Sequence, residues 1–411
     1  MDLNEILTVT IVLAAIFGYI NQRWIKWPPT IGIMVLALLF SIVLAITGRF
    51  IPAFLQKAVV IIAGIDFQKV LMNFMLSFLL FAGAIHINAN RLKKERIPII
   101  VLSTAGTVIS TLLVGALSWY LFKLFHLDID FVYCLLFGAL ISPTDPIAVL
   151  AILKAAKIPP SLEIKISGES LFNDGMAVVL FLSIAEAAKN GTQNFAVFDL
   201  VKLFAQEAAG GLLFGAILGY IGFWALRFID NYSIEILVTL AMVMGGYTLA
   251  SYLHVSGPLA MVVAGIITGN KAKEEVMSGI TQDYLSKFWE LIDEILNAVL
   301  FLLVGMEMLI IKVNIIVMLI GAIIIFGVLL ARWVSVFIPV YFLKFRMPFE
   351  KNVVTILTWG GLRGGLSVAL ALSLAPSMHK DEFVLITYIV VVFSILVQGL
   401  SIGRVVKRLS S

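Results

Sequence analysis

Long apolar runs separated by short polar breaks dominate the pattern of this chain. The first run extends from Ile6 to Ile20, a second begins at Thr30, and similar runs follow to the C-terminus. A membrane-spanning helix needs roughly 20 mostly apolar residues, whereas a spanning strand shows about ten residues of alternating polarity. Because the runs are continuous and do not alternate, the pattern predicts an all-α polytopic membrane protein.

Proline, glycine and charge clusters divide the chain into about thirteen predicted spans. The segment 50–65 is short and amphipathic, so we expect it to lie on the membrane surface and not to cross the bilayer. The thirteen spans are predicted to begin near Asn4, Thr30, Phe67, Ile97, Phe131, Leu162, Val197, Ser233, Ser256, Tyr284, Val313, Asn352 and Glu382.

Composition agrees with this pattern and charge adds an orientation. Of the 411 residues, 61% are hydrophobic and only 13% are charged, against about a quarter charged in soluble domains. Most Lys and Arg residues fall into one set of alternate loops, and basic loops face the cytoplasm. We therefore expect a multi-pass protein of the plasma (inner) membrane, with the N-terminus outside and the C-terminus in the cytoplasm. The net charge of +4 is not a signal for nucleic-acid binding.

Two of the predicted spans are interrupted in mid-membrane. The fifth span reads FGALISPTDPIAVLAIL, where Pro143 and Pro146 each remove a backbone donor and disfavour helix before them. The twelfth reads TWGGLRGGLSVALAL, where four glycines surround Arg363 and weaken the helix. Both interruptions therefore predict discontinuous helices.

The positions of the two breaks predict an internal repeat. If the chain folds as two six-span halves on either side of a seventh span, the breaks fall at equivalent places, and the odd offset gives the halves opposite orientations. Paired interruptions in inverted halves mark the binding site of many transporters. We therefore predict inverted repeats with a transport site at the two discontinuous helices.

The sixth span carries the densest set of polar residues, in the segment SGESLFNDGMAVVLF. At about 100° per residue, Ser170 and Asp174 share one face of the helix. Glu169 and Asn173 share the adjacent face. Ionisable groups at this depth are costly and usually functional.

Charge balance suggests a role for each acid. A buried carboxylate needs a partner, so Glu169 is predicted to pair with Arg363, while the long side chain of Arg332 could snorkel toward the interface. Asp174 then remains as the titratable group. It would hold a proton or a hard cation, and the remaining oxygen ligands would come from Asp145, Ser170 and backbone carbonyls freed near Thr144.

Competition between cation and proton for one carboxylate is a sufficient mechanism for exchange. Protonation of Asp174 expels the cation, and deprotonation restores its ligand. A neutral amide at Asn173 leaves one exchanging carboxylate, so we expect one cation to exchange for one proton without net movement of charge.

These motifs carry a family resemblance. The segments SPTDPIAVLAILK (142–154), GESLFNDGMAVVLF (168–181) and WGGLRGGLSVALAL (359–372) closely resemble the first group of monovalent cation/proton antiporters, which includes NhaP- and NHE-type sodium/proton exchangers. Residues 249–269 and 288–308 are also similar, so the resemblance covers nearly the whole chain.

The resemblance implies an NhaA/NhaP-like fold in a homodimer that needs no cofactor. A core of about 67–190 and 313–411 would move like an elevator past a dimerisation domain of about 1–66 and 191–312. It also implies that the ion binds at Asp174, Asp145, Ser170 and Thr144, that Asn173 marks the electroneutral branch, and that Glu169 and Arg363 form a stabilising pair. Ala82 departs from the family, because many relatives carry glutamate there.

Three alternatives stay open at this point. Potassium could replace sodium or lithium as the cation. An intramembrane aspartyl protease would also place two aspartates on neighbouring helices, although Asp174 lacks the preceding Gly-x-Gly of such enzymes. A passive cation channel would lack proton coupling. An ATP-driven pump is disfavoured because the chain has no phosphate-binding P-loop, so we expect a transporter and not an enzyme.

One glycine pattern predicts packing. Gly211, Gly215 and Gly219 form a small-xxx-small ridge on the seventh span, which favours close approach of another helix.

Overall fold

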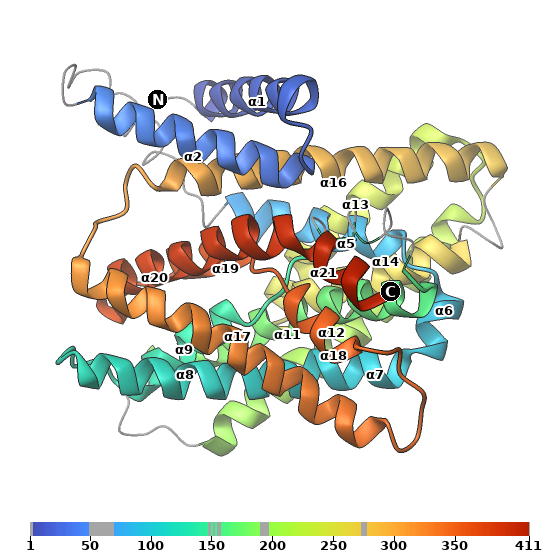
Figure 1. The fold of residues 1–411 in the computed structure, drawn as a ribbon. Coiled ribbons are helices and arrows are strands. Elements are labelled where there is room, and N and C mark those ends of the chain that lie inside the picture. The colour runs from blue at the N-terminus through green and yellow to red at the C-terminus, as the bar shows by residue number, and fades with distance from the viewer. Residues whose placement is uncertain are drawn as a thin grey trace.

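A computed structural model gives the fold as almost entirely helical. It describes residues 3–48, 70–146, 149–150, 153, 158–189, 197–272 and 278–410. The segment 50–65, predicted to lie on the membrane surface, falls outside the described residues. In Figure 1 most of the helices lie roughly along one common direction, as expected for helices that cross a bilayer.

A described helix begins within five residues of twelve of the thirteen predicted starts, and the predicted start at Phe67 lies outside the described residues. In the first part of the chain the helices are α1 (Leu3–Ile20), α2 (Pro29–Thr47), α5 (Leu76–Ile85), α6 (Ala89–Lys94), α7 (Arg96–Val101), α8 (Thr107–Leu124), α9 (Phe131–Ile141) and α11 (Pro160–Lys189). The remaining helices are α12 (Val197–Leu226), α13 (Tyr232–Tyr252), α14 (Gly257–Ile267), α16 (Gly279–Glu307), α17 (Ile315–Leu343), α18 (Val353–Trp359), α19 (Gly365–Leu372), α20 (Lys380–Phe393) and α21 (Leu400–Ser410).

The surface of this bundle is apolar. Among the described helical stretches, seven are long and apolar enough to cross a membrane. Large side chains such as Phe326 (72% exposed) and Phe342 (67%) point outward, although soluble proteins rarely expose broad apolar patches. These features support the polytopic membrane fold, while the exact number of thirteen crossings stays a prediction.

Small residues allow α12 to approach α14 closely. A Cβ atom added to Gly211 would lie 2.6 Å from the carbonyl oxygen of Ser256, and one added to Gly215 would lie 2.5 Å from that of Ala260. Gly219 likewise faces Ile267 and Ala264. The predicted packing role of this glycine ridge is therefore confirmed.

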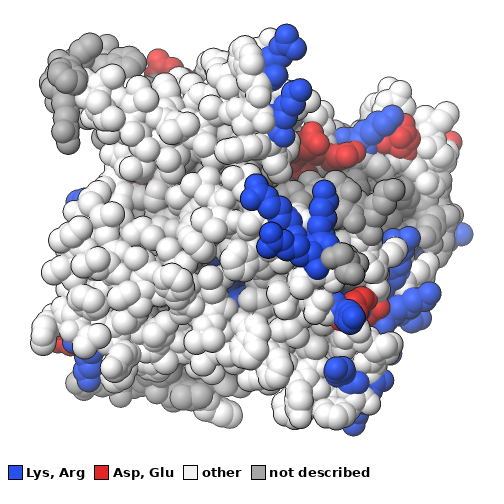
Figure 2. All heavy atoms as spheres, viewed as in Figure 1, with Lys and Arg blue, Asp and Glu red and all other residues white. Residues whose placement is uncertain are grey.

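Basic side chains gather at one end of the bundle. On the face seen in Figure 2, most Lys and Arg residues lie at the end where Figure 1 places the C-terminus. Acidic side chains on the same face gather mainly along α16. This gathering of basic side chains at one end agrees with the predicted concentration of Lys and Arg in one set of alternate loops.

A buried lysine at the start of α11 joins three segments. Lys165 is 1% exposed, and its Nζ lies 2.9 Å from both carboxylate oxygens of Glu350 and 3.3 Å from Oε2 of Glu95. The Ser161 hydroxyl also donates to Glu350. Glu350 lies between α17 and α18, and Glu95 lies between α6 and α7, so this cluster ties the helix that bears Asp174 to two loops.

We predict that Glu350→Gln destabilises the protein by roughly 1–3 kcal/mol near neutral pH, because it leaves the buried Lys165 with one carboxylate. Burial alone would raise the pKa of Glu350, but the hydrogen bonds from Ser161 and Lys165 outweigh burial and lower its pKa below 4.5. Its contribution is therefore complete above that pH and is lost as the pH falls through the lowered folded-state pKa. Thermal unfolding of both proteins between pH 3.5 and 7.5 would measure the difference.

The matched control is Glu290→Gln, which changes an exposed acid on α16. It should leave the unfolding midpoint nearly unchanged at every pH. A pH-independent effect of Glu350→Gln, or an equal effect of the control, would contradict the role of the lysine cluster.

Candidate functional site

The two predicted helix breaks cross each other in the structure. Helix α9 ends at Ile141, and residues 149–150 and 153 beyond the break are helical again, while residues 360–364 separate α18 from α19. Asp145 and Leu362 form an antiparallel backbone bridge, in which the Asp145 N–H donates to the Leu362 carbonyl at 2.8 Å. Both discontinuous helices are thus confirmed, and each break satisfies part of the other's backbone.

Arg363 donates hydrogen bonds to the break in the fifth span and does not pair with Glu169. Its Nη1 donates to the carbonyls of Ser142 and Pro143, and its backbone N–H donates to the Ser394 hydroxyl at 2.9 Å. The two carbonyls follow the C-terminal end of α9, where the helix dipole favours a positive charge. The guanidinium therefore satisfies the Ser142 carbonyl, which would receive no helical hydrogen bond from Pro146, and the Pro143 carbonyl at the interrupted end.

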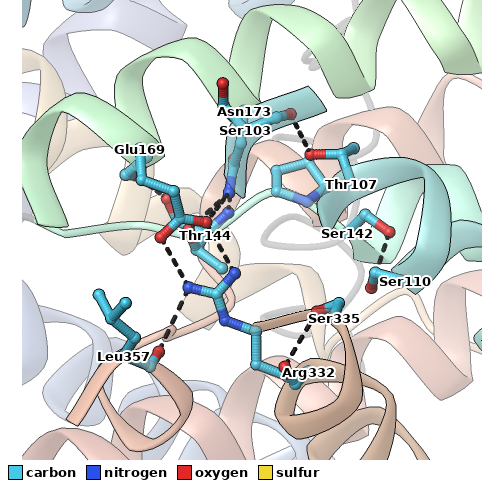
Figure 3. A network of polar contacts seen from close by, with 12 residues as sticks. Ser103, Thr107, Ser110, Ser142, Thr144, Glu169, Asn173, Arg332, Ser335 and Leu357 are labelled. Carbon is cyan, nitrogen blue, oxygen red and sulfur yellow. Dashed lines mark hydrogen bonds and ion pairs between the residues drawn. The ribbon is translucent and has the colours of Figure 1, made fainter. Parts of the chain in front are cut away.

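Glu169 takes its partner from α17. The two Nη atoms of Arg332 each donate to one carboxylate oxygen of Glu169 at 2.7 Å, and Nη2 also lies 3.2 Å from the Leu357 carbonyl. Figure 3 shows this fork. The predicted pairing of Glu169 with Arg363 is therefore wrong in its partner. Arg332 does not snorkel either, because it is only 5% exposed.

Asn173 joins the sixth span to the break. Its Oδ1 accepts from the Thr144 N–H at 3.1 Å, and its Nδ2 donates to Thr144 Oγ1 at 2.8 Å and to Glu169 Oε1 at 3.2 Å. The Ser170 hydroxyl donates to the Thr144 carbonyl. These four residues are buried, and Thr144, Glu169 and Ser170 line a small cavity together with Arg332. The structure thus brings Thr144, Ser170 and Asn173 together as predicted, and it also places Glu169 beside them.

The two aspartates border this buried group and are less enclosed. Asp145 and Asp174 are both partly exposed, and a Cβ atom on Gly364 would lie 2.6 Å from Oδ2 of Asp145, so only glycine leaves room for that carboxylate. Asp174 lies close enough to Asp145 for their charges to interact. Within the described part of the chain, the Asp174 carboxylate has no hydrogen bond or ion pair.

The donor set is suited to a small hard cation. Within the described ranges, no group of three or more His, Cys, Asp or Glu side chains could hold a metal ion. The available ligands are two carboxylates with hydroxyl and carbonyl oxygens, which are the ligands that hard cations prefer. Such a set carries too little charge to favour a tightly held transition metal and fits an ion that binds and leaves.

The fourth span contributes hydroxyl groups that our reasoning from the sequence missed. Ser142 Oγ lies 3.1 Å from Ser110 Oγ and 3.2 Å from Thr111 Oγ1. Figure 3 shows Ser103 and Thr107 on the same side of the break. The spacing of these residues, at 103, 107 and 110–111, places them on one helical face, and this pattern could have revealed them.

The chain matches known proteins along almost its whole length. The family model described as "Sodium/hydrogen exchanger, transmembrane" matches residues 11–408. The chain is 47% identical to the Na(+)/H(+) antiporter NhaP of Pseudomonas aeruginosa, over 98% of this chain and 96% of that protein. It is 35% identical to the Na(+)/H(+) antiporter NhaH of Halobacillus aidingensis, over 84% of each.

A solved structure has the same fold. The sodium proton antiporter MjNhaP1 from Methanocaldococcus jannaschii, determined at pH 8, superposes with a TM-score of 0.78 and covers 100% of this chain and 99% of its own, at 19% identity. Together with the family match, this fold explains the crossing of two broken helices. The chain belongs to the sodium/hydrogen exchanger family, a family of transporters and not of enzymes.

Proposed function

We propose that this protein is an antiporter of the plasma membrane that exchanges Na⁺, or Li⁺, for H⁺. The observation that carries the proposal is the Asp174 carboxylate, which is partly exposed and has no partner among the described residues. It lies one helical turn from Ser170, whose hydroxyl contacts the Thr144 carbonyl. The relatives NhaP and NhaH are Na(+)/H(+) antiporters, which supports sodium over potassium.

The mechanism follows from the two occupants of Asp174. In the deprotonated state the carboxylate would coordinate the cation with Asp145, Ser170 and the Thr144 carbonyl. A proton on Asp174 removes the negative charge and the cation leaves. Because the site holds one occupant at a time, movement of the loaded site across the membrane exchanges one for the other.

The surrounding charges support an electroneutral stoichiometry of one to one. Arg332 neutralises Glu169 through two hydrogen bonds of 2.7 Å, so Glu169 is not available for exchange. Asn173 is neutral, and its amide is fully used in holding Thr144 and Glu169. One exchanging carboxylate then carries either one Na⁺ or one H⁺, with the same net charge in both loaded states.

The packing supports only part of the domain division implied by the family, because α5 of the proposed core packs mainly against α14 and α16 of the proposed dimerisation domain. The proposed core, about 67–190 and 313–411, includes α17 packed against α8 and α20, and the proposed dimerisation domain, about 1–66 and 191–312, includes α16 packed against α1 and α2. Figure 1 places α1, α2 and α16 together at one side of the bundle. We propose that two copies associate through this domain and that the core moves like an elevator between two water-filled openings.

The proposed orientation places the C-terminus in the cytoplasm. The basic end of the bundle in Figure 2 would face inward, because positively charged loops are retained on that side. The acidic side chains along α16 would then attract cations to the inner opening.

The direct test uses inverted membrane vesicles with an acid interior and a pH-sensitive dye. We expect Na⁺ and Li⁺ to drive proton release, and Asp174→Asn to abolish it, because an amide cannot alternate between a charged and a protonated form. Na⁺ should also raise the unfolding midpoint of the purified wild type and not of the variant. Asp230→Asn changes an exposed loop acid and should remain active. Full activity of Asp174→Asn would remove this residue from the mechanism, and a response to K⁺ alone would reassign the cation.

We predict that exchange is electroneutral. In proteoliposomes with a Na⁺ gradient, a potential-sensitive dye should report no membrane potential while the internal pH changes. An imposed potential should leave the rate unchanged, because no net charge crosses the membrane. A membrane potential that develops during turnover would refute the one-to-one stoichiometry. In that case a K⁺ ionophore should collapse the potential and make exchange faster.

We predict that Glu169→Gln lowers stability by about 3–5 kcal/mol, because it leaves the Arg332 charge buried without a carboxylate. The double variant Glu169→Leu/Arg332→Met removes both charges and should recover much of this loss. Folded yield and the thermal midpoint in detergent would measure both effects. Lys312→Met is the control, because Lys312 is 80% exposed in its pair with Asp381 and such pairs contribute little. Normal stability of Glu169→Gln with weakened Na⁺ binding would instead make Glu169 a ligand.

A further inference from the structure

A carboxylate without an ion pair lies at the middle of α16. Asp293 is 14 residues from each end of this helix, which runs from Gly279 to Glu307 and extends along most of the bundle in Figure 1. Within the described part of the chain, the Asp293 carboxylate accepts one hydrogen bond, from the Asn297 amide, and forms no ion pair. A charge at such a depth is costly and usually functional, so this position indicates a partner that comes and goes.

Asp293 faces the crossing of the two helix breaks. Leu300 lies seven residues, or about two turns, further along the same face of α16. It packs directly on the second break, because a Cβ atom on Gly365 would lie 2.5 Å from Leu300 Cγ. The neighbouring Gly364 lies against the carboxylate of Asp145. The face of α16 that carries Asp293 is therefore turned toward the proposed transport site.

Asp145 is coupled to an acid in each of the two proposed domains. It lies close enough to Asp293 on α16 for their charges to interact, and it also interacts with Asp174 on α11. Neither Asp293 nor Asp174 has a Lys or Arg partner among the described residues. Carboxylates that are this close repel each other, and a cation held between them removes the repulsion.

Asn297 fixes the Asp293 side chain and leaves an oxygen for a ligand. Its Nδ2 donates to the Asp293 carbonyl at 2.8 Å and to Oδ1 of the same residue at 3.1 Å. Its own Oδ1 accepts no hydrogen bond from the residues that the structure describes. A carboxylate and an amide oxygen on one helical turn are ligands that suit a hard cation.

Water reaches Asp293 from one side only. Asp293 is partly exposed, whereas the following residues of the same face are closed off, with Asn297 3%, Leu300 5% and Val304 0% exposed. Access therefore comes from the side on which α16 begins. In the proposed orientation this is the cytoplasmic side, because Lys287 near the start of α16 belongs to the basic end of the bundle.

We propose that Asp293 is a transient ligand of the transported cation. With the Asn297 amide oxygen it would take up the cation at the cytoplasmic opening and bring it beside Asp145, from which the cation passes to Asp174. This inference rests on the proposed function and deepens it. Because α16 belongs to the domain that stays in place while the core moves, Asp293 acts only in the state that is open to the cytoplasm. It therefore sets the affinity for the cation on that face alone.

The test compares the two faces of the membrane. Added Na⁺ reaches the cytoplasmic face in inverted vesicles and the opposite face in right-side-out vesicles, and a pH-sensitive dye follows exchange at pH 8.5, where protons compete least. We expect Asp293→Asn to raise the half-saturating Na⁺ concentration on the cytoplasmic face roughly five-fold, because one nearby negative charge is lost. The maximal rate, and the half-saturating concentration on the opposite face, should stay within two-fold of the wild type. Asp293→Glu keeps the charge and should recover most of the affinity.

Glu294→Gln is the matched control, because Glu294 is the adjacent acid on α16 and is exposed. Its charge is screened by solvent and salt, so the variant should shift the half-saturating concentration less than two-fold. An equal shift in the control would assign the effect to the surface charge of α16 and overturn the proposal. An unchanged cytoplasmic affinity in Asp293→Asn, an equal shift on both faces, or a lower maximal rate without a shift would also overturn it.

The same vesicles separate this inference from the proposed function. If the wild type does not respond to Na⁺, the proposed function fails and this inference fails with it. If the wild type responds, Asp174→Asn is inactive and Asp293→Asn matches the wild type, only the role of Asp293 is refuted. Asp293→Ser also removes the charge and gives the same comparison if Asp293→Asn does not fold.

Discussion

The crossing of two interrupted helices is the constraint on which the rest of this structure depends. A helix broken inside a bilayer leaves backbone donors and acceptors that no lipid can satisfy. The bridge between Asp145 and Leu362 satisfies one donor and one acceptor, and Arg363 satisfies the carbonyls of Ser142 and Pro143. Once these groups are satisfied within the protein, the oxygen ligands beside them can face an ion, and the break becomes a site.

Division of charge between the two arginines leaves one acid for transport. Both Nη atoms of Arg332 are engaged with Glu169, and Arg363 is engaged with the end of α9. Neither arginine forms an ion pair with Asp174 in the described part of the chain. A permanent bridge to Asp174 would hold that carboxylate in its charged form and abolish competition by the proton. Under the proposed mechanism, this arrangement separates the charges that stabilise the fold from the charge that exchanges.

The sequence pattern predicted the elements of this fold better than their partners. Proline and glycine act on the local backbone, so the breaks at Pro143 and at Gly360–Gly365 could be predicted without a structure. The partner of Glu169 could not, because it depends on how α17 is rotated relative to α11, and the pattern of apolar residues on a membrane helix that is apolar all round does not indicate that rotation. The partner of Arg363 was also predicted wrongly, because the argument from charge balance considered only carboxylates as partners. It left out the backbone carbonyls freed at the proline-containing break.

Asn173 connects the stoichiometry of exchange to the geometry of the site. The carboxamide accepts one hydrogen bond from Thr144 and donates two, to Thr144 Oγ1 and to Glu169. A charged aspartate at this position could still accept from the Thr144 N–H, but it could not donate, and it would place a second negative charge against Glu169, which already accepts two hydrogen bonds from Arg332. A second exchanging acid at position 173 would therefore require a different partner for Glu169 and different hydrogen bonds to Thr144. Under the proposed mechanism, the number of protons exchanged and the hydrogen bonds that hold the broken helix would thus be set by the same side chain.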